Sequence, residues 1–186
     1  MEERWWSRPK NWTQYWKNPQ SLALRNPDLF GPPKRGAFMF FPMRFPYQRL
    51  IVKDPHRKVH AVFRPLIPVD LSRGGRWLPT YGLIDSGADI CLFGKDLALR
   101  LGLILPSGRQ KSLQGIGRGR ISFYLHVVTL RIGNHTVKAE VGFSEGISHL
   151  PVAILGQKGF FENFLVAFNY PKRWVEVIKA RHHALF

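Results

Sequence analysis

The sequence contains one cysteine and no long apolar run, and each of these features limits the kinds of protein that the chain can be. Cys91 alone among 186 residues excludes an intrachain disulfide framework. No uninterrupted apolar stretch approaches the roughly 18 residues that a membrane-spanning helix requires. The first residues lack the charged-then-apolar design of a secretory signal. We therefore expect a cytoplasmic protein of a reducing compartment, with Cys91 as a small buried hydrophobe.

Acidic residues are also scarce. Twelve Asp and Glu stand against 28 Lys and Arg, which gives a net charge of +16 and a pI of about 10.7. This balance favours anionic partners such as nucleic acid or an acidic lipid surface, but it also fits a basic protein that is merely soluble. A hydrophobic content of 45% is typical of a globular chain, and the length suffices for one domain with a core and an appendage.

The first 50 residues differ from the rest. They hold seven of the 14 prolines, four of the six tryptophans, and nine Lys or Arg against three acids. Frequent prolines preclude long helices and central strands, so we expect irregular structure. Interleaved Trp and Arg could stack on bases, lie at a membrane interface, or pack onto the protein or its partner. We assign 1–57 to a basic, Pro/Trp-rich N-terminal arm, 58–180 to a folded domain and 181–186 to a tail.

Short strands and turns dominate the remainder. Alternation of apolar and polar residues predicts a hairpin over 121–132 and 136–143, joined at Gly133 and Asn134. We expect further strands at 59–63, 66–71, 77–84, 90–93, 165–168 and 174–178. A brief helix is expected over 96–101, ended by Gly102, and a second one after Gly156. The predicted class is mostly β with two short helices.

Residues 83–89 read Leu-Ile-Asp-Ser-Gly-Ala-Asp and carry the clearest chemical signal. Asp-Ser/Thr-Gly-Ala/Ser after a hydrophobic strand is how aspartic peptidases present a catalytic carboxylate. The alternative is an Asp-Ser-Gly turn that only closes a strand. Because such catalysis needs two facing carboxylates and the element occurs once, the catalytic interpretation implies a homodimer with its site on the two-fold axis.

Further motifs in a fixed order strengthen that interpretation. Over roughly 60–178 the chain resembles the retropepsin-like aspartic proteases in the order of four elements. These are Arg64 to Val69, the Asp85 element, a helix ending in Leu-Gly-Leu at 101–103, and the run 152–156. The match is better to their bacterial single-domain branch than to the related retroviral enzymes. The resemblance implies a retropepsin-like closed β-barrel or sandwich half with a flap hairpin, active as a homodimer. It implies that Ile154, Leu155 and Gly156 pack beside the site, and that the flap is formed by Gly115, Ile116, Gly117, Arg118 and Gly119. An ordinary glycine-rich hairpin tip is the alternative for the flap.

The resemblance also implies the roles of the loop residues. Two Asp85 carboxylates a few ångströms apart cannot both ionise, so one activates water and the other donates a proton to the scissile carbonyl. Ser86 would brace the paired loops, and Gly87 lets the backbone approach the carboxylate. Because Ala88 lacks the hydroxyl that many pepsin-like enzymes carry, we expect a rate maximum nearer neutrality than pepsin's.

Two departures from the family pattern stand out. Viral relatives usually carry Arg where this chain has Gln157, and that Arg pairs with the acid matching Asp89. Gln157 could hydrogen-bond to Asp89 but brings no charge. Lys158 or another cation could compensate, or the dimer contact could be weaker. Arg118 replaces a small residue near the flap tip, which would favour acidic peptides or hinder closure.

Other chemistries find little support in the sequence. His182 and His183 are adjacent, so their side chains diverge and no metal set is spaced around them. Ile84 stands where a serine-hydrolase elbow needs glycine, and Arg120 stands where a dinucleotide loop needs it. We expect no cofactor and no metal, and an aspartic endopeptidase acting on polypeptides. The alternative is a catalytically weak module whose arm binds nucleic acid or another anionic partner.

Overall fold

The structure is a computed structural model that describes residues 42–53, 59–114, 120–148, 150 and 152–180. The chain divides into two units, Met1–Met43 and Arg44–Phe186. All the described strands lie in the second unit, apart from the first residue of β1. No helix of the described residues is long and apolar enough to cross a membrane.

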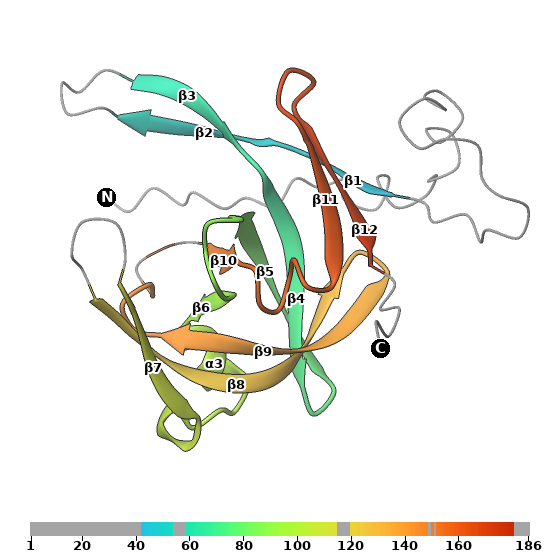
Figure 1. The fold of residues 1–186 in the computed structure, drawn as a ribbon. Helices are drawn as coiled ribbons and strands as arrows, with labels where there is room; N and C mark the ends of the chain where they lie inside the picture. Colours follow the sequence, from blue (N-terminus) through green and yellow to red (C-terminus); the bar gives the residue numbers. More distant parts are fainter. Residues whose placement is uncertain (1–41, 54–58, 115–119, 149, 151, 181–186) are drawn as a thin grey trace, which may run out of the picture. The chain divides into compact units, whose positions relative to one another are not determined.

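A seven-stranded sheet is the largest sheet of the second unit (Figure 1). Its strand order is β4-β5-β10-β6-β9-β8-β7, and β4 pairs additionally with β8. The strands are β4 (Leu66–Arg73), β5 (Arg76–Ile84), β6 (Leu92–Gly94), β7 (Arg109–Gln114), β8 (Arg120–Ile132), β9 (His135–Ser144) and β10 (Ala153–Leu155). Helix α3 (Lys95–Arg100) and the 3-10 turn η2 (Leu105–Ser107) connect β6 to β7.

Two smaller sheets complete the unit. A three-stranded sheet has the order β1-β12-β11, from β1 (Met43–Pro46), β12 (Trp174–Lys179) and β11 (Phe164–Asn169). A two-stranded ribbon pairs β2 (Gln48–Lys53) with β3 (Val59–Arg64), and β3 leads through Pro65 into β4.

The core lies inside the large sheet. The predicted hairpin of β8 and β9 turns at Gly133, whose φ of +60° favours glycine, and Val137, Ala139, Val141 and Phe143 are all buried as expected. β8 pairs with β9 on one side and with β4 on the other, and Ile67 and Leu71 of β4 and Leu130 and Ile132 of β8 are fully buried. The mostly β class and the helix after β6 are thus confirmed.

The second predicted helix is wrong. Residues 156–163 form a series of turns, in which the amides of Phe161 and Glu162 bond to carbonyls five residues earlier. Gly159 has a φ of +97°, which no helix contains, and its N–H donates to the Glu162 carboxylate at 2.9 Å. The spacing of Phe160, Phe161 and Phe164 also fits one face of a helix, but in the structure the turns bury Phe160 and Phe164.

The expectation of irregular structure is wrong for residues 43–53, which form β1 and β2. Pro42 precedes the short β1 and Pro46 is its last residue, so neither interrupts its interior. Arg44 of β1 donates from Nε to Glu176 of β12 at 2.9 Å and lies over the Trp174 ring at 4.3 Å. Residues 1–41, including the tryptophan-rich stretch, lie outside the described residues.

Candidate active site

Asp85 directly follows β5 and is fixed by the strands on either side of it. Its N–H donates to the Leu155 carbonyl of β10 at 3.0 Å, and the preceding Ile84 N–H donates to the Pro65 carbonyl at 3.1 Å. β10 runs parallel to β5, with Leu155 opposite Ile84, so the backbone enters the loop between two paired strands. Asp85 is therefore held at a defined place, while its side chain remains only half-buried.

The loop of residues 85–89 is a tight turn built around the Asp85 carboxylate. The Gly87 N–H donates to Asp85 Oδ1 at 3.0 Å, and the Ala88 N–H donates to the Asp85 carbonyl at 3.2 Å. A Cβ on Gly87 would lie 3.3 Å from Oδ1, so glycine permits the close approach of the amide. Ser86, Gly87 and Asp89 are exposed, so the loop presents its outer side to solvent.

A second backbone segment holds this loop from the inside. The Gln157 N–H donates to the Ala88 carbonyl at 2.8 Å, and the Lys158 N–H donates to the Asp89 carbonyl at 2.9 Å. A Cβ on Gly156 would stand 2.5 Å from the Ile90 carbonyl oxygen and 2.6 Å from that of Ala88. Only glycine allows the two backbones to lie this close, which explains the glycine that ends the run 152–156.

The side chains of residues 157 and 158 do not meet Asp89, contrary to the expectation from the sequence. Gln157 Nε2 donates to the Ser86 carbonyl at 3.2 Å, and Lys158 Nζ donates to Glu140 Oε2. Among the described residues the Asp89 carboxylate has no ion-pair partner. Residues 157 and 158 therefore hold the loop through neutral hydrogen bonds, and the Lys158 side chain connects the turn after β10 to strand β9.

Glu140 of β9 is the centre of that connection. It accepts from Lys158 and from Arg109 of β7, whose Nη2 lies 3.3 Å from Oε1. The hydrogen bond from Lys158 is the largest cause that holds the pKa of Glu140 below its ordinary value. Three separate segments, β7, β9 and the turn after β10, are thus tied at one carboxylate.

An apolar cluster that the sequence reading did not single out lies beside the loop. Its buried members are Ile90, Leu92, Phe123, Leu125 and Ile147, and partly buried Leu113, Ile121 and Ile154 pack against it. The alternation of Ile121, Phe123 and Leu125 along β8 was the signal that could have revealed it. Predicted packing residues Ile154 and Leu155 thus lie beside the loop, Leu155 fully buried.

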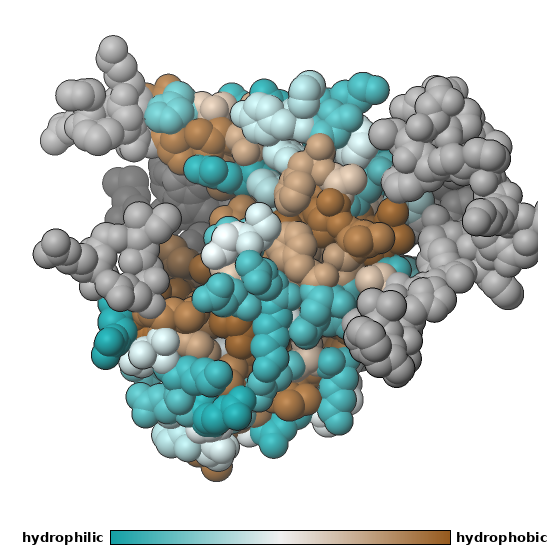
Figure 2. All heavy atoms as spheres, in the orientation of Figure 1, coloured by the Kyte–Doolittle hydropathy of each residue, from teal (hydrophilic) through white to brown (hydrophobic). Residues whose placement is uncertain are grey.

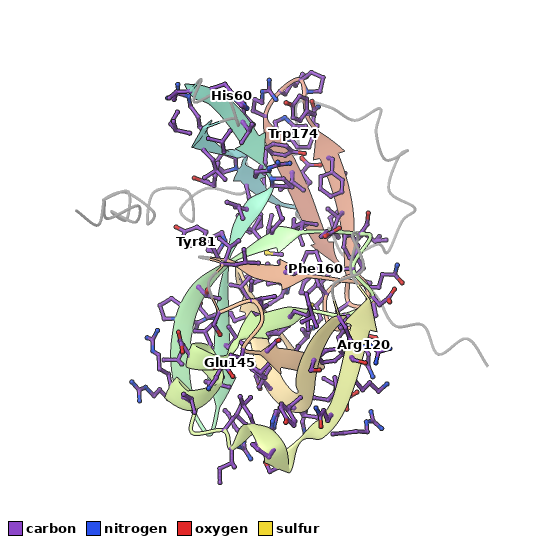
Figure 3. The ribbon with its side chains drawn as sticks, turned by 90° about the vertical axis from the view of Figure 1, so that its left-hand side faces the viewer. His60, Tyr81, Arg120, Glu145, Phe160 and Trp174 are labelled. Carbon is purple, nitrogen blue, oxygen red and sulfur yellow. The ribbon has the colours of Figure 1, made fainter. Side chains whose placement is uncertain are left out.

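The five residues assigned to a flap, 115–119, lie outside the described residues. The strands that flank them are well defined: β7 pairs with β8 from Arg109 opposite Leu125 to Gln114 opposite Arg120. Figure 3 labels Arg120, the first residue of β8, which lies opposite the last residue of β7.

Cys91 is fully buried, as expected. Burial raises the pKa of its thiol to about 12, so it stays protonated and is a poor nucleophile near neutral pH. In the part of the chain that the structure describes, no group of three or more His, Cys, Asp or Glu could hold a metal ion.

No family model and no curated protein matches the chain. Solved structures do match, at low identity. The retropepsin-like aspartic protease from Rickettsia conorii is 15% identical, with 69% of this chain and 98% of that chain covered and a TM-score of 0.45. The retroviral protease-like domain of Ddi1 from Leishmania major is 14% identical over 65% of this chain and 98% of that one, with a TM-score of 0.42. The EIAV protease complexed with the inhibitor HBY-793 is 24% identical over 57% and 88%, with a TM-score of 0.39. The chain is thus similar to proteases and protease-like domains of the retropepsin type.

Proposed function

We propose that this chain is an aspartic endopeptidase, active as a homodimer in which each copy contributes one Asp85 carboxylate. The observation that carries the proposal is the double fixation of the Asp85 loop. Leu155 and Pro65 hold the backbone of its entry, and residues 157 and 158 hold its exit. Such fixation of a half-exposed carboxylate is what a preorganised catalytic group requires, and a simple strand-closing turn does not need it.

The dimer follows from the chemistry. General acid and general base must act together on one peptide bond, and this loop supplies a single carboxylate at its centre. Because Ser86 and Gly87 are exposed, a second copy of the loop can face the first across a two-fold axis. Ser86 would then lie at the axis, where its hydroxyl can bond to the partner loop.

In such a pair one carboxylate is ionised and the other is protonated, because two close negative charges repel. The ionised member accepts a proton from water as the water oxygen bonds to the scissile carbonyl carbon. The protonated member donates its proton to the carbonyl oxygen, which takes the electron pair of the carbonyl bond. In the resulting gem-diol one hydroxyl gives its proton to the carboxylate that is now ionised, and the carbonyl re-forms as the C–N bond breaks. The leaving amine takes the proton that the other carboxyl group received from water, so the pair returns to its starting state.

The substrate would be an extended polypeptide lying between the loop and the tip of the β7–β8 pair. Partly buried Leu113, Ile121 and Ile154 offer apolar surface beside the loop. Residues 115–119 would fold over the peptide and exclude water, with Arg118 attracting acidic side chains. The missing hydroxyl at Ala88 places the expected rate maximum nearer neutrality than pepsin's.

Digestion of a peptide library by the wild type and by Asp85→Asn tests the proposal. The wild type should cleave and Asp85→Asn should not, while both remain folded and dimeric. Asp96→Asn is a suitable control, because Asp96 is an exposed carboxylate in the first turn of α3. Equal cleavage by all three chains, or none by any dimeric form, would contradict an Asp85-dependent peptidase. The second outcome would leave the binding module as the remaining alternative.

A further inference from the structure

The β2–β3 ribbon leaves the large sheet at the end that carries Asp85. β4 and β5 are antiparallel, with Leu66 opposite Leu83, so β4 begins where β5 ends. Only Pro65 separates β3 from β4, and its carbonyl accepts the Ile84 N–H immediately before Asp85. Figure 1 shows β3 running on into β4 and the ribbon extending past the end of β5. The catalytic loop and the ribbon therefore lie at the same end of the sheet.

The root of the ribbon is anchored within the unit. The Arg173 guanidinium lies 4.2 Å from the centre of the Phe63 ring and 3.9 Å from that of Tyr170. The Tyr47 N–H, just before β2, donates to the Arg173 carbonyl at 2.8 Å. The ribbon thus leaves the unit in a fixed direction, because the turn between β11 and β12 holds its base.

The outer part of the ribbon carries an exposed apolar face. In the antiparallel register Ile51 lies opposite Ala61, and Val59 stands two positions before Ala61 on β3, so the side chains of Ile51, Val59 and Ala61 share one face. We call Ile51, Val59 and Ala61 the ribbon face. Val59 is 58% exposed, Ile51 is 36% exposed, and Ala61 is exposed too. Figure 2 shows brown, hydrophobic surface over the ribbon, and Figure 3 places His60 of β3 at the outer end of the unit.

We propose that the ribbon face packs against a second copy of this chain in the active dimer. A lone two-stranded ribbon is marginally stable in water, so apolar residues at its outer part favour a docking partner. The identity of that partner rests on the proposed function. An Asp85 pair brings the partner's loop to within a few ångströms of this loop, at the end of the sheet where the ribbon emerges. The proposed Asp85 pair would therefore place a second copy of the chain next to the ribbon.

Sedimentation velocity on a dilution series of the full chain tests the proposal. The double variant Ile51→Lys with Val59→Lys should raise the dimer dissociation constant by at least about tenfold, because two apolar side chains leave the interface and like charges face each other. The matched control is Leu99→Lys on α3, since Leu99 is 56% exposed and belongs to another element. It should leave the dissociation constant unchanged. An unaltered constant in the double variant overturns the proposal.

Hydrogen exchange on the wild type gives a readout that needs no substitution. Amides of β2 and β3 should become more protected as the concentration rises through the dimer range. Protection that does not depend on concentration would assign the ribbon face to residues of the same chain and overturn the proposal.

The two proposals fail separately. A dimer that cleaves peptides but ignores the ribbon variants overturns the ribbon proposal alone. A ribbon-dependent dimer with no Asp85-dependent cleavage overturns the proposed function alone, whereas a chain that stays monomeric at every concentration overturns both.

Discussion

The side-chain amide of Gln157 donates a hydrogen bond of 3.2 Å to the backbone carbonyl of Ser86. The backbone N–H of the same residue donates to Ala88 at 2.8 Å, so one residue holds the Asp85 loop at two points. Both bonds are neutral and do not depend on the ionisation of any side chain. We infer that Gln157 is a positioning residue for the proposed reaction.

Replacing Gln157 by Ala should lower kcat by about tenfold or more while KM changes little. The loop would keep its backbone bonds but lose the contact that fixes Ser86, and small displacements of a reacting group are costly in rate. The free energy of unfolding should fall by only about 1 kcal/mol, since the lost bond is exposed. Steady-state kinetics and urea denaturation measure the two effects.

Gln48→Ala is the matched control, because Gln48 Nε2 makes the same kind of exposed bond, to the Pro46 carbonyl at 3.3 Å. It should show a similar small stability change with unchanged kcat. A fall in kcat that merely follows lost stability in both variants would argue against a positioning role.

Gly156→Ala should destabilise the fold by about 3 kcal/mol. The new Cβ would lie 2.5 Å from the Ile90 carbonyl and 2.6 Å from the Ala88 carbonyl, and backbone atoms cannot move aside as a flexible side chain can. Gly146→Ala is the control, because its Cβ would meet only atoms at 3.5 Å. Thermal or urea unfolding of both variants decides the point, and equal stabilities would mean that the two backbones can separate freely.

The sequence predicted the elements that local pattern determines. The β8–β9 hairpin and helix α3 were predicted because alternation of apolar residues and helix-ending residues are visible in neighbouring positions. The close approach of the backbone to the Asp85 carboxylate at Gly87 was expected in the same way. The turn after Gly156 was missed because the spacing of its three phenylalanines also fits a helix. The deciding features are the positive φ of Gly159 and the bond from its N–H to Glu162, which are not visible in the spacing.

The remaining differences between the predicted and the observed structure come from contacts between residues that are far apart in the sequence. β1 lies next to β12, and Arg44 of β1 bonds to Glu176 of β12 although the two residues are 132 positions apart in the sequence. Nothing local marks either residue for the other. The family pattern likewise suggested Asp89 as a partner for Gln157 or Lys158. In the structure the Gln157 side chain bonds to the Ser86 carbonyl, and Lys158 bonds to Glu140 of β9.

Breaking the Arg44–Glu176 pair should cost about 3 kcal/mol of unfolding free energy. The Glu176 side chain is only 6% exposed, so Arg44→Ala would leave a nearly buried carboxylate without its partner and remove the stacking on Trp174. The exposed Lys95–Glu145 pair supplies the comparison, and Lys95→Ala should cost below about 1 kcal/mol. Urea denaturation of both variants measures the difference. Equal costs would show that β1 contributes little to the fold.

Glu140 should make stability depend on pH in the acid range. Its pKa in the folded chain lies below the ordinary value of 4.5, chiefly because Lys158 hydrogen-bonds to the ionised carboxylate. A lowered pKa means that the unfolded chain binds the proton first. The stabilisation is therefore fully present above the ordinary value and is lost as the pH falls through the folded pKa.

The variant Glu140→Gln removes this titration. Its unfolding free energy should lie below that of the wild type by up to about 1 kcal/mol at pH 7, because the ion pairs are partly solvated. The difference should vanish once the pH has fallen below the pKa of Glu140. Glu145→Gln, which removes one well-exposed pair, should differ less from the wild type at pH 7. The difference in unfolding free energy between the wild type and Glu140→Gln could instead persist unchanged into strong acid. The Glu140 side chain would then act through packing, and the contact between β7, β9 and the turn after β10 would not be electrostatic.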